Sequence, residues 1–232
     1  MRTFFLVGIG LSLLCGPPLA AEAPDPEDEK QKLSYSIGYQ VGGDFKRQGL
    51  EIYPELVVKG VLDAQAGSEP LMAPEEMRQT LTELKQQAAA AAKQQREEQA
   101  RKNLAEGEAF LAANAEKEGV VTLPSGLQYQ VLSEGEGNPP TATDTVTVHY
   151  RGTLIDGTEF DSSYGRGEPA TFPLDRVIPG WTEGLQLMRP GAKYRLFVPP
   201  ALAYGERGGS SKIGPNSALV FEVELLSVQP AE

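Results

Sequence analysis

Apolar and polar positions in the first part of the chain follow the period of a helix. Within residues 29–47 an apolar side chain recurs at every fourth position, at Leu33, Ile37, Val41 and Phe45. Residues 54–66 carry a second such pattern, which begins at a proline and ends before a glycine. Two amphipathic helices this short have too little apolar surface to form a stable core alone. We therefore expect this segment to pair with a second copy of the chain.

A third helical pattern begins at Pro74 and continues to residue 118, which corresponds to about 65 Å of unbroken helix. Residues 93–103 within it are polar on nearly every side. Such a pattern is typical of a helix that crosses solvent between two domains. A long coiled coil is the alternative, but the apolar stripe that starts at Met77 and Leu81 ends too early for it. The pattern therefore predicts a rigid connecting helix.

After Gly119 the pattern changes to the alternation of strands. The strand-like segments are 120–126, 127–132, 143–154, 158–161, 192–198 and 217–228. One short helix is predicted at residues 179–188, with Trp181, the only tryptophan, in its first turn and Leu187 on its apolar side. Several antiparallel strands with a single helix predict an α+β domain in which a curved sheet wraps around that helix.

The start of the chain has the features of a secretory signal. A positive first segment is followed by an apolar run that is too short to span a bilayer, and then by small residues. We expect signal cleavage after Ala20 or Ala21. Attachment of a lipid at Cys15 is the alternative, although Leu14 is larger than the residue that should precede a lipidated cysteine. Cleavage would remove the only cysteine, so the mature chain would form no disulfide.

These features predict an exported, soluble protein. Composition and charge also bear on the class of partner. The 232 residues are 40% hydrophobic, as in globular proteins, and the net charge is −11. This charge argues against nucleic acid as a partner, because a surface that binds phosphates needs clustered Lys and Arg.

Two features that suggest other chemistry are interpreted as structural. His149 is the only histidine, and it lies in an alternating strand with no partner in sight for a catalytic triad. Residues 208–214 are rich in glycine, but they lack the spacing of a phosphate-binding loop, and no helix follows them. We expect this segment to form a flexible flap over a pocket.

Five segments between residues 120 and 228 give a more specific signal. They are His149-Tyr-Arg-Gly, Phe160-Asp-Ser-Ser, Val177-Ile-Pro-Gly-Trp, Ala203-Tyr-Gly and Leu219-Val-Phe-Glu-Val-Glu-Leu. In order and spacing they resemble the signature segments of FKBP-type peptidyl-prolyl cis-trans isomerases. The part before them is similar to the dimerisation segment of the exported bacterial Mip and FkpA branch, through its helical pattern and the segments at residues 107–111 and 123–129.

The resemblance implies a division of the chain into four parts. Residues 1–21 would be the signal peptide, and residues 22–74 would be an acidic start and a helical dimerisation domain. Residues 75–118 would form the connecting helix, and residues 119–232 an isomerase domain with the FKBP fold. The resemblance also implies a homodimer formed through the N-terminal helices. It further implies that the exported protein lies in the periplasm, and it leaves association with the outer membrane or the cell surface open.

Carried over position by position, the resemblance implies a pocket that binds proline. Its catalytic residues would be Tyr150, Phe160, Asp161, Trp181, Tyr204 and Phe221, and its other substrate-binding residues Val177, Ile178, Ile213 and Arg166. Rotation about an X–Pro bond is slow because amide resonance must be lost. An apolar pocket that removes water from the carbonyl favours the twisted amide. The reaction needs no nucleophile, metal or cofactor.

The predicted function is therefore the isomerisation of X–Pro bonds in exported proteins, with chaperone activity that depends on the dimer. The partners would be unfolded or proline-containing polypeptides, and the resemblance also implies a pocket for macrolide inhibitors. At Ala170 many small eukaryotic relatives carry an aromatic residue that lines the pocket, so substrate preference and macrolide affinity stay open. The alternative function is that of a non-catalytic holdase, a protein that binds unfolded or proline-containing segments without turning them over.

Overall fold

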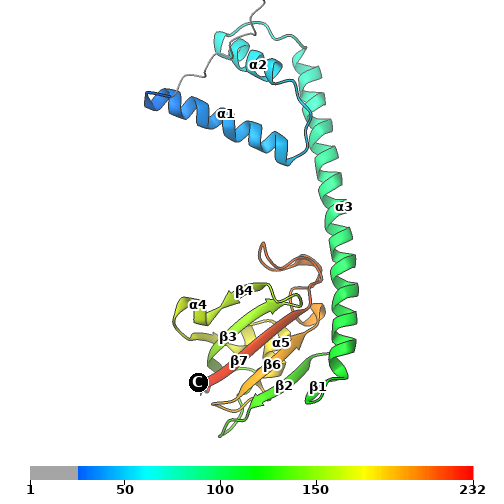
Figure 1. The fold of residues 1–232 in the computed structure, drawn as a ribbon, viewed down its shortest axis with the longest axis vertical. Helices are drawn as coiled ribbons and strands as arrows, with labels where there is room; N and C mark the ends of the chain where they lie inside the picture. Colours follow the sequence, from blue (N-terminus) through cyan, green and yellow to red (C-terminus); the bar gives the residue numbers. More distant parts are fainter. Residues whose placement is uncertain (1–25, 232) are drawn as a thin grey trace, which may run out of the picture. The chain divides into compact units, whose positions relative to one another are not determined.

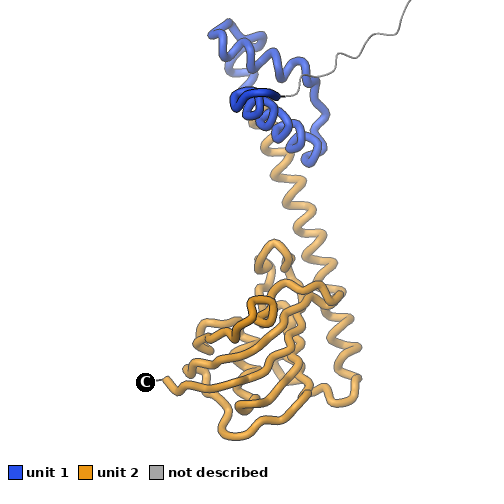
Figure 2. The backbone as a smooth tube through the Cα atoms, turned by 60° about the vertical axis from the view of Figure 1, so that its left-hand side comes forward, with its two compact units in different colours: residues 1–77 blue, residues 78–232 orange. Residues whose placement is uncertain are grey.

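The computed structural model describes residues 26–231, and the predictions of a signal peptide and of its cleavage or lipidation lie outside the described residues. The chain divides into two compact units, residues 1–77 and residues 78–232 (Figure 2). The long helix α3 (Pro74–Ala115) begins in the first unit and ends in the second. No helix among the described residues is long and apolar enough to cross a membrane.

The first unit is helical, as its apolar pattern predicts. Helix α1 (Glu29–Arg47) begins at Asp28, whose side chain accepts a hydrogen bond from the backbone N–H of Gln31 at 2.8 Å. Helix α2 (Pro54–Ala66) begins at a proline and ends at Gly67, which adopts the left-handed conformation of a C-terminal cap. No residue of either helix is buried. Their apolar faces are therefore exposed in the single chain.

The second unit is built on one antiparallel sheet, shown in Figure 1. Its strands are β1 (Val120–Thr122), β2 (Gln128–Ser133), β3 (Thr145–Leu154), β4 (Glu159–Ser162), β5 (Ala170–Pro173), β6 (Lys193–Val198) and β7 (Leu219–Gln229). The strand order is β1-β2-β6-β7-β3-β4, and β5 also pairs with β3. The predicted α+β fold is confirmed, and β5 is the one strand that the sequence pattern did not predict.

Short helical segments connect these strands. Helix α4 (Ser163–Arg166) follows β4, and helix α5 (Pro179–Leu185) is the helix predicted from the pattern around Trp181. Three 3-10 turns complete the unit: η1 (Leu174–Arg176), η2 (Pro200–Leu202) and η3 (Gly205–Arg207).

Helix α5 lies against the sheet because glycines face β6. A Cβ at Gly180 would lie 2.5 Å from a methyl group of Val198, and one at Gly184 would lie 2.8 Å from Leu196. The helix axis can therefore approach the strand more closely than a helix with side chains at these positions. Trp181 is buried, as expected for the inner side of this helix, but Leu187 is 39% exposed, so its assignment to the apolar side was wrong.

The C-terminal part of α3 packs on this sheet unit. Gly107 is buried against Ala218, and a Cβ at Gly107 would lie only 3.1 Å from the Cβ of Ala218. The ring of Phe110 lies 6.1 Å from that of Phe197, and Asn114 donates a hydrogen bond to Gln128 at 2.9 Å. These contacts fix the last turns of α3 on β2, β6 and the start of β7.

The pattern at residues 93–103 predicted a helix that crosses solvent, but this segment also binds a loop of the sheet unit. The guanidinium of Arg96 and the amide of Asn103 donate hydrogen bonds to backbone carbonyls of residues 206, 207 and 215. A periodicity argument assigns polar side chains to solvent, but long polar side chains also bind exposed carbonyl groups of a neighbouring loop.

Candidate active site

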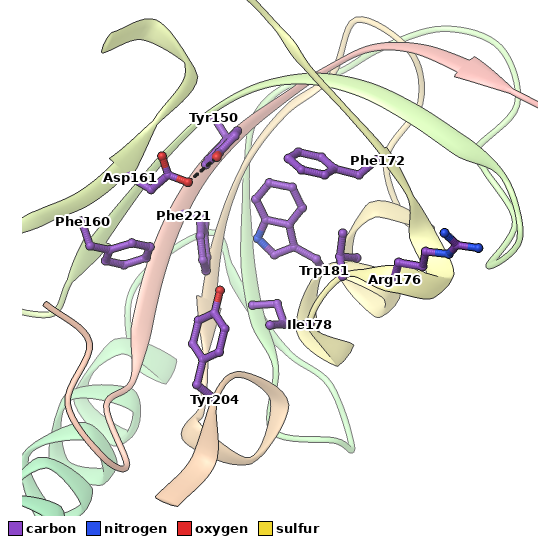
Figure 3. A pocket seen from close by; sticks show the side chains of 10 residues that line it. Tyr150, Phe160, Asp161, Phe172, Arg176, Ile178, Trp181, Tyr204 and Phe221 are labelled. Carbon is purple, nitrogen blue, oxygen red and sulfur yellow. Dashed lines mark hydrogen bonds between the residues drawn. The ribbon is translucent and has the colours of Figure 1, made fainter. Parts of the chain in front are cut away.

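One cavity of about 410 Å³ opens on the inner face of the sheet unit, and Figure 3 shows the side chains around it. The residues that line it are Tyr150, Phe160, Asp161, Phe172, Arg176, Val177, Ile178, Trp181, Tyr204 and Phe221. Six of these ten have aromatic side chains. The cavity therefore offers a largely apolar surface to a ligand.

Three neighbouring strands supply one wall of the pocket. Tyr150 comes from β3, Phe160 and Asp161 from β4, and Phe221 from β7. Gly152 of β3 lies between these strands, paired with Asp161 on one side and Phe221 on the other. A Cβ at Gly152 would lie 2.6 Å from the ring of Phe160 and 2.9 Å from that of Phe221. The glycine therefore allows both rings to lie directly over the strand.

Trp181 forms the floor of the pocket and is only 4% exposed. Its indole meets the rings of Tyr150, Phe172 and Phe221 edge to face, at centroid distances of 5.1, 5.7 and 5.3 Å. Such pairs stabilise an aromatic cluster beyond the surface that it buries. The indole Nε1 is buried without a hydrogen-bond partner. The position of Trp181 is therefore fixed by ring packing on three sides.

Asp161, Tyr150 and Arg166 form a hydrogen-bonded triangle at the edge of the pocket. The hydroxyl of Tyr150 donates to Asp161 Oδ2 and accepts from Arg166 Nη2 at 2.9 Å. Arg166 Nη1 also donates to Asp161 Oδ1 at 2.5 Å, which closes the triangle. The guanidinium lies over the Tyr150 ring, 5.5 Å from its centroid.

The triangle shifts the pKa values of its members in opposite directions. Burial alone would raise the pKa of Asp161, but the hydrogen bonds from Tyr150 and Arg166 outweigh it and hold this pKa below its ordinary value. Burial, followed by the hydrogen bond to Asp161, raises the pKa of Tyr150. At neutral pH the carboxylate is therefore ionised and the phenol keeps its proton.

Tyr204 differs from the other rings because its side chain is 42% exposed. Figure 3 shows its phenol directed into the space between Phe221 and Ile178. Burial, and then the negative charge of Asp161, raise the pKa of this phenol. The hydroxyl makes no hydrogen bond to another described residue. It is therefore a protonated donor available to a ligand in the pocket.

The structure brings together eight of the ten site residues predicted from the sequence. Of the other two, Arg166 reaches the site through its bonds to Asp161 and Tyr150. Ile213 is buried in the core and contacts the loop that follows Tyr204. Neither belongs to the lining of the cavity.

Sequence reasoning missed two lining residues, Phe172 and Arg176. Phe172 lies on β5, two residues after Ala170, so both side chains are on the same side of that strand. Ala170 is packed against the core and does not line the pocket, whereas Phe172 contributes an aromatic wall. Arg176 lies at the edge with its guanidinium directed away from the rings (Figure 3). The sequence did hold a signal for Phe172. It lies two positions after Ala170, so the alternation of a strand would have placed both side chains on the same face.

His149 has the structural surroundings expected of it. Its Nδ1 lies 3.0 Å from the hydroxyl of Ser163, and its ring stacks on Tyr164 at 4.7 Å. The same Ser163 hydroxyl accepts a hydrogen bond from the backbone N–H of Tyr150. Within residues 26–231 no group of His, Cys, Asp and Glu side chains has the arrangement of a metal site.

Two family models match successive parts of the chain. One is described as the domain amino terminal to FKBP-type peptidyl-prolyl isomerase and matches residues 30–131. The other is described as FKBP-type peptidyl-prolyl cis-trans isomerase and matches residues 136–226. Together they include the helices of the first unit, α3 and the pocket.

The chain is similar to known proteins over nearly its whole length. The peptidyl-prolyl cis-trans isomerase Mip of Coxiella burnetii is 49% identical over 229 residues, which cover 99% of both chains. The outer membrane protein MIP of Legionella longbeachae is 44% identical and covers 99% of this chain and 97% of its own. The crystal structure of FkpA from Escherichia coli superposes with a TM-score of 0.70 at 42% identity, over 89% of this chain and 99% of that one.

The aromatic pocket, the two matching family models and these relatives lead to one assignment. The chain belongs to the FKBP-type peptidyl-prolyl cis-trans isomerases, in the Mip- and FkpA-like branch that carries the amino-terminal helical domain.

Proposed function

We propose that the pocket accelerates X–Pro rotation by removing the amide from water and binding its twisted form. In the planar amide the C–N bond has double-bond character and the carbonyl is strongly polar. Twisting makes the carbonyl less polar, so an apolar environment favours the transition state over the ground state. The observation that carries this proposal is the set of rings around Trp181, which offers a proline a floor and walls with few polar groups.

The polar groups of the site would then orient the substrate. The Tyr204 phenol is directed into the pocket and is free to donate a hydrogen bond to a substrate carbonyl. Asp161 and Arg166 hold the hydroxyl of Tyr150 from two sides, so the ring of Tyr150 is fixed against Trp181. In this proposal Asp161 transfers no proton and acts by fixing the wall. Macrolide inhibitors of the family are expected to occupy the same cavity.

The mechanism is tested by the rate at which the mature chain isomerises a proline-containing peptide. Replacing Phe160→Ala removes one wall, and we expect kcat/KM to fall by at least about tenfold, which is about 1.4 kcal/mol. Tyr129→Ala is the matched control, because Tyr129 is a half-buried aromatic residue that stacks on Tyr194 outside the pocket. Since no proton is transferred, the rates in H₂O and D₂O should agree.

Two results would contradict this mechanism. A solvent isotope effect of about twofold or more would indicate proton transfer in the rate-limiting step. Equal loss of rate in Phe160→Ala and Tyr129→Ala would mean that general destabilisation, rather than the pocket wall, is responsible. A mature chain with no rate above the uncatalysed reaction would favour the holdase instead.

We also propose that the protein is exported and acts as a homodimer with chaperone activity. The similarity to the outer membrane protein MIP of Legionella longbeachae supports export. Ile37 of α1 is 55% exposed and Val61 of α2 is 53% exposed, and both line an apolar groove of about 680 Å³ between these helices. Covering this surface with the same surface of a second copy would bury it. Exposed aromatic residues nearby, such as Tyr35 and Tyr39, would be available to unfolded chains.

A further inference from the structure

The loop of residues 205–217 lies next to one residue of the pocket lining, Tyr204. It starts directly after Tyr204 and ends shortly before β7, and the backbone N–H of Asn216 donates to the carbonyl of Gly205 at 2.8 Å. Gly209 lies so close to the Tyr204 ring that a Cβ there would be 3.1 Å from it and equally close to Ile213. The loop therefore packs directly against the Tyr204 ring.

Helix α3 contacts both ends of this loop, which lies beside it in Figures 1 and 2. At the first end, Arg96 Nη2 donates to the carbonyl of Arg207 at 2.7 Å and to that of Glu206 at 3.1 Å. At the other end, Asn103 Nδ2 donates to the carbonyl of Pro215 at 2.7 Å and lies 3.2 Å from the hydroxyl of Ser217. Bonds from a charged guanidinium are stronger than those between neutral groups.

The orientation of the Asn103 side chain is itself set on the helix. Gln99 Nε2 donates to Asn103 Oδ1 at 2.6 Å, which leaves the amide nitrogen of Asn103 directed at the loop. Arg96 and Asn103 are seven positions apart, or about two helical turns. They therefore present two donors, about 10 Å apart along one side of a rigid helix, to the two ends of the loop.

We propose that Arg96 and Asn103 are positioning residues of the isomerase site, which act through the 205–217 loop on Tyr204. Neither residue lines the pocket. By holding both ends of the loop, they limit the movement of Gly209 against the Tyr204 ring, so the phenol stays directed at the substrate. The connecting helix is then part of the catalytic unit, in addition to linking it to the N-terminal helices.

The test uses the full mature chain with Arg96→Ala, Asn103→Ala and both together. We expect the double variant to lower kcat/KM for a proline-containing peptide by about three- to tenfold, since each net hydrogen bond contributes modestly. Hydrogen exchange at the Gly209 and Ile213 amides, which are bonded within the loop, should become faster. Arg101→Ala is the matched control, because Arg101 lies on the same helix and makes no hydrogen bond or ion pair with a described residue.

A second background separates positioning from a merely structural role. In Tyr204→Phe the hydroxyl is absent, so its position no longer matters. The Arg96→Ala, Asn103→Ala pair should therefore lower kcat/KM by a smaller factor in this background than in the unmodified chain. Unchanged kcat/KM in the double variant would overturn the proposal. So would an equal loss of activity in both backgrounds, because that outcome would assign the effect to general destabilisation of the unit.

Discussion

At the scale of single residues, the pocket separates two tasks. Apolar rings around Trp181 form a lining of low polarity, and polar groups at the edge hold the hydroxyl of Tyr150. The triangle of Asp161, Tyr150 and Arg166 belongs to the second group, because each member is bonded to the other two. The ionisation of Asp161 therefore maintains the wall that Tyr150 forms.

This arrangement predicts the pH dependence of the enzyme. The pKa of Asp161 is below its ordinary value and that of Tyr150 is above its own. The ionised Asp161 therefore stabilises the folded pocket fully at any pH above the ordinary carboxyl pKa of about 3.9. This stabilisation is lost only as the pH falls through the lowered pKa of Asp161 in the folded chain. We expect kcat/KM to be constant from about pH 5 to pH 9, measured with a peptide that has no titrating group. A half-maximal rate inside this range would contradict the assigned triangle.

The Tyr204 hydroxyl permits a second prediction at this scale. Tyr204→Phe removes a donor that makes no bond within the described chain, so stability should not change. Loss of one hydrogen bond to the substrate should lower kcat/KM by about three- to tenfold. Tyr164→Phe is the control, because the Tyr164 hydroxyl interacts with Glu224 on the other face of the sheet. Equal activity of Tyr204→Phe and the unmodified chain would show that this phenol does not contact the substrate.

At the scale of elements, the close approach of α5 to β6 places Trp181 at the pocket floor. In Gly184→Ala the new Cβ would lie 2.8 Å from a methyl group of Leu196, which is closer than van der Waals contact allows. Because Leu196 is fully buried, either its side chain or helix α5 must shift. We expect a loss of about 1–3 kcal/mol in unfolding free energy, measured by urea denaturation, together with reduced kcat/KM. Gly165→Ala, where the nearest atom is 4.0 Å away, should change neither quantity. Equal stability of the two variants would contradict the close packing.

The elements also show where sequence reasoning succeeds and where it fails. The bounds of α1 and α2 follow from apolar spacing, a proline at one start and a glycine at one end. Strand β5 was missed because its four residues directly follow Pro169 and end with Pro173, and two prolines so close together resemble a loop. Phe172 was missed with it. The signature segments identified most of the pocket lining because each carries at least one lining residue in a recognisable local pattern.

Contacts between distant segments lie beyond such reasoning. The bonds from Arg96 and Asn103 to the 205–217 loop join residues more than a hundred positions apart. No periodicity encodes them, because the acceptors are backbone carbonyls that every residue carries. The same polar pattern that suggested a solvated spacer was in fact compatible with a docked helix. Only the folded arrangement distinguishes the two.

At the scale of the whole molecule, the two units have different relations to solvent. The sheet unit has a core in which residues such as Leu127, Leu196 and Val223 are fully buried. Helices α1 and α2 contain no buried residue, so their apolar faces require a cover. A second copy of the chain is the cover that we propose, and it requires no change in the isomerase pocket.

Separating these two units experimentally gives the last prediction. Ile37→Asp with Val41→Asp places two charges in the α1–α2 groove, where burial in a dimer interface would be costly. We expect sedimentation to show a monomer, with kcat/KM on a short peptide unchanged and suppression of aggregation of an unfolded protein reduced. Ser36→Asp is the control, because Ser36 is exposed on α1 and does not line the groove. A variant that stays dimeric would refute this interface, and one that loses isomerase activity would refute the independence of the two functions.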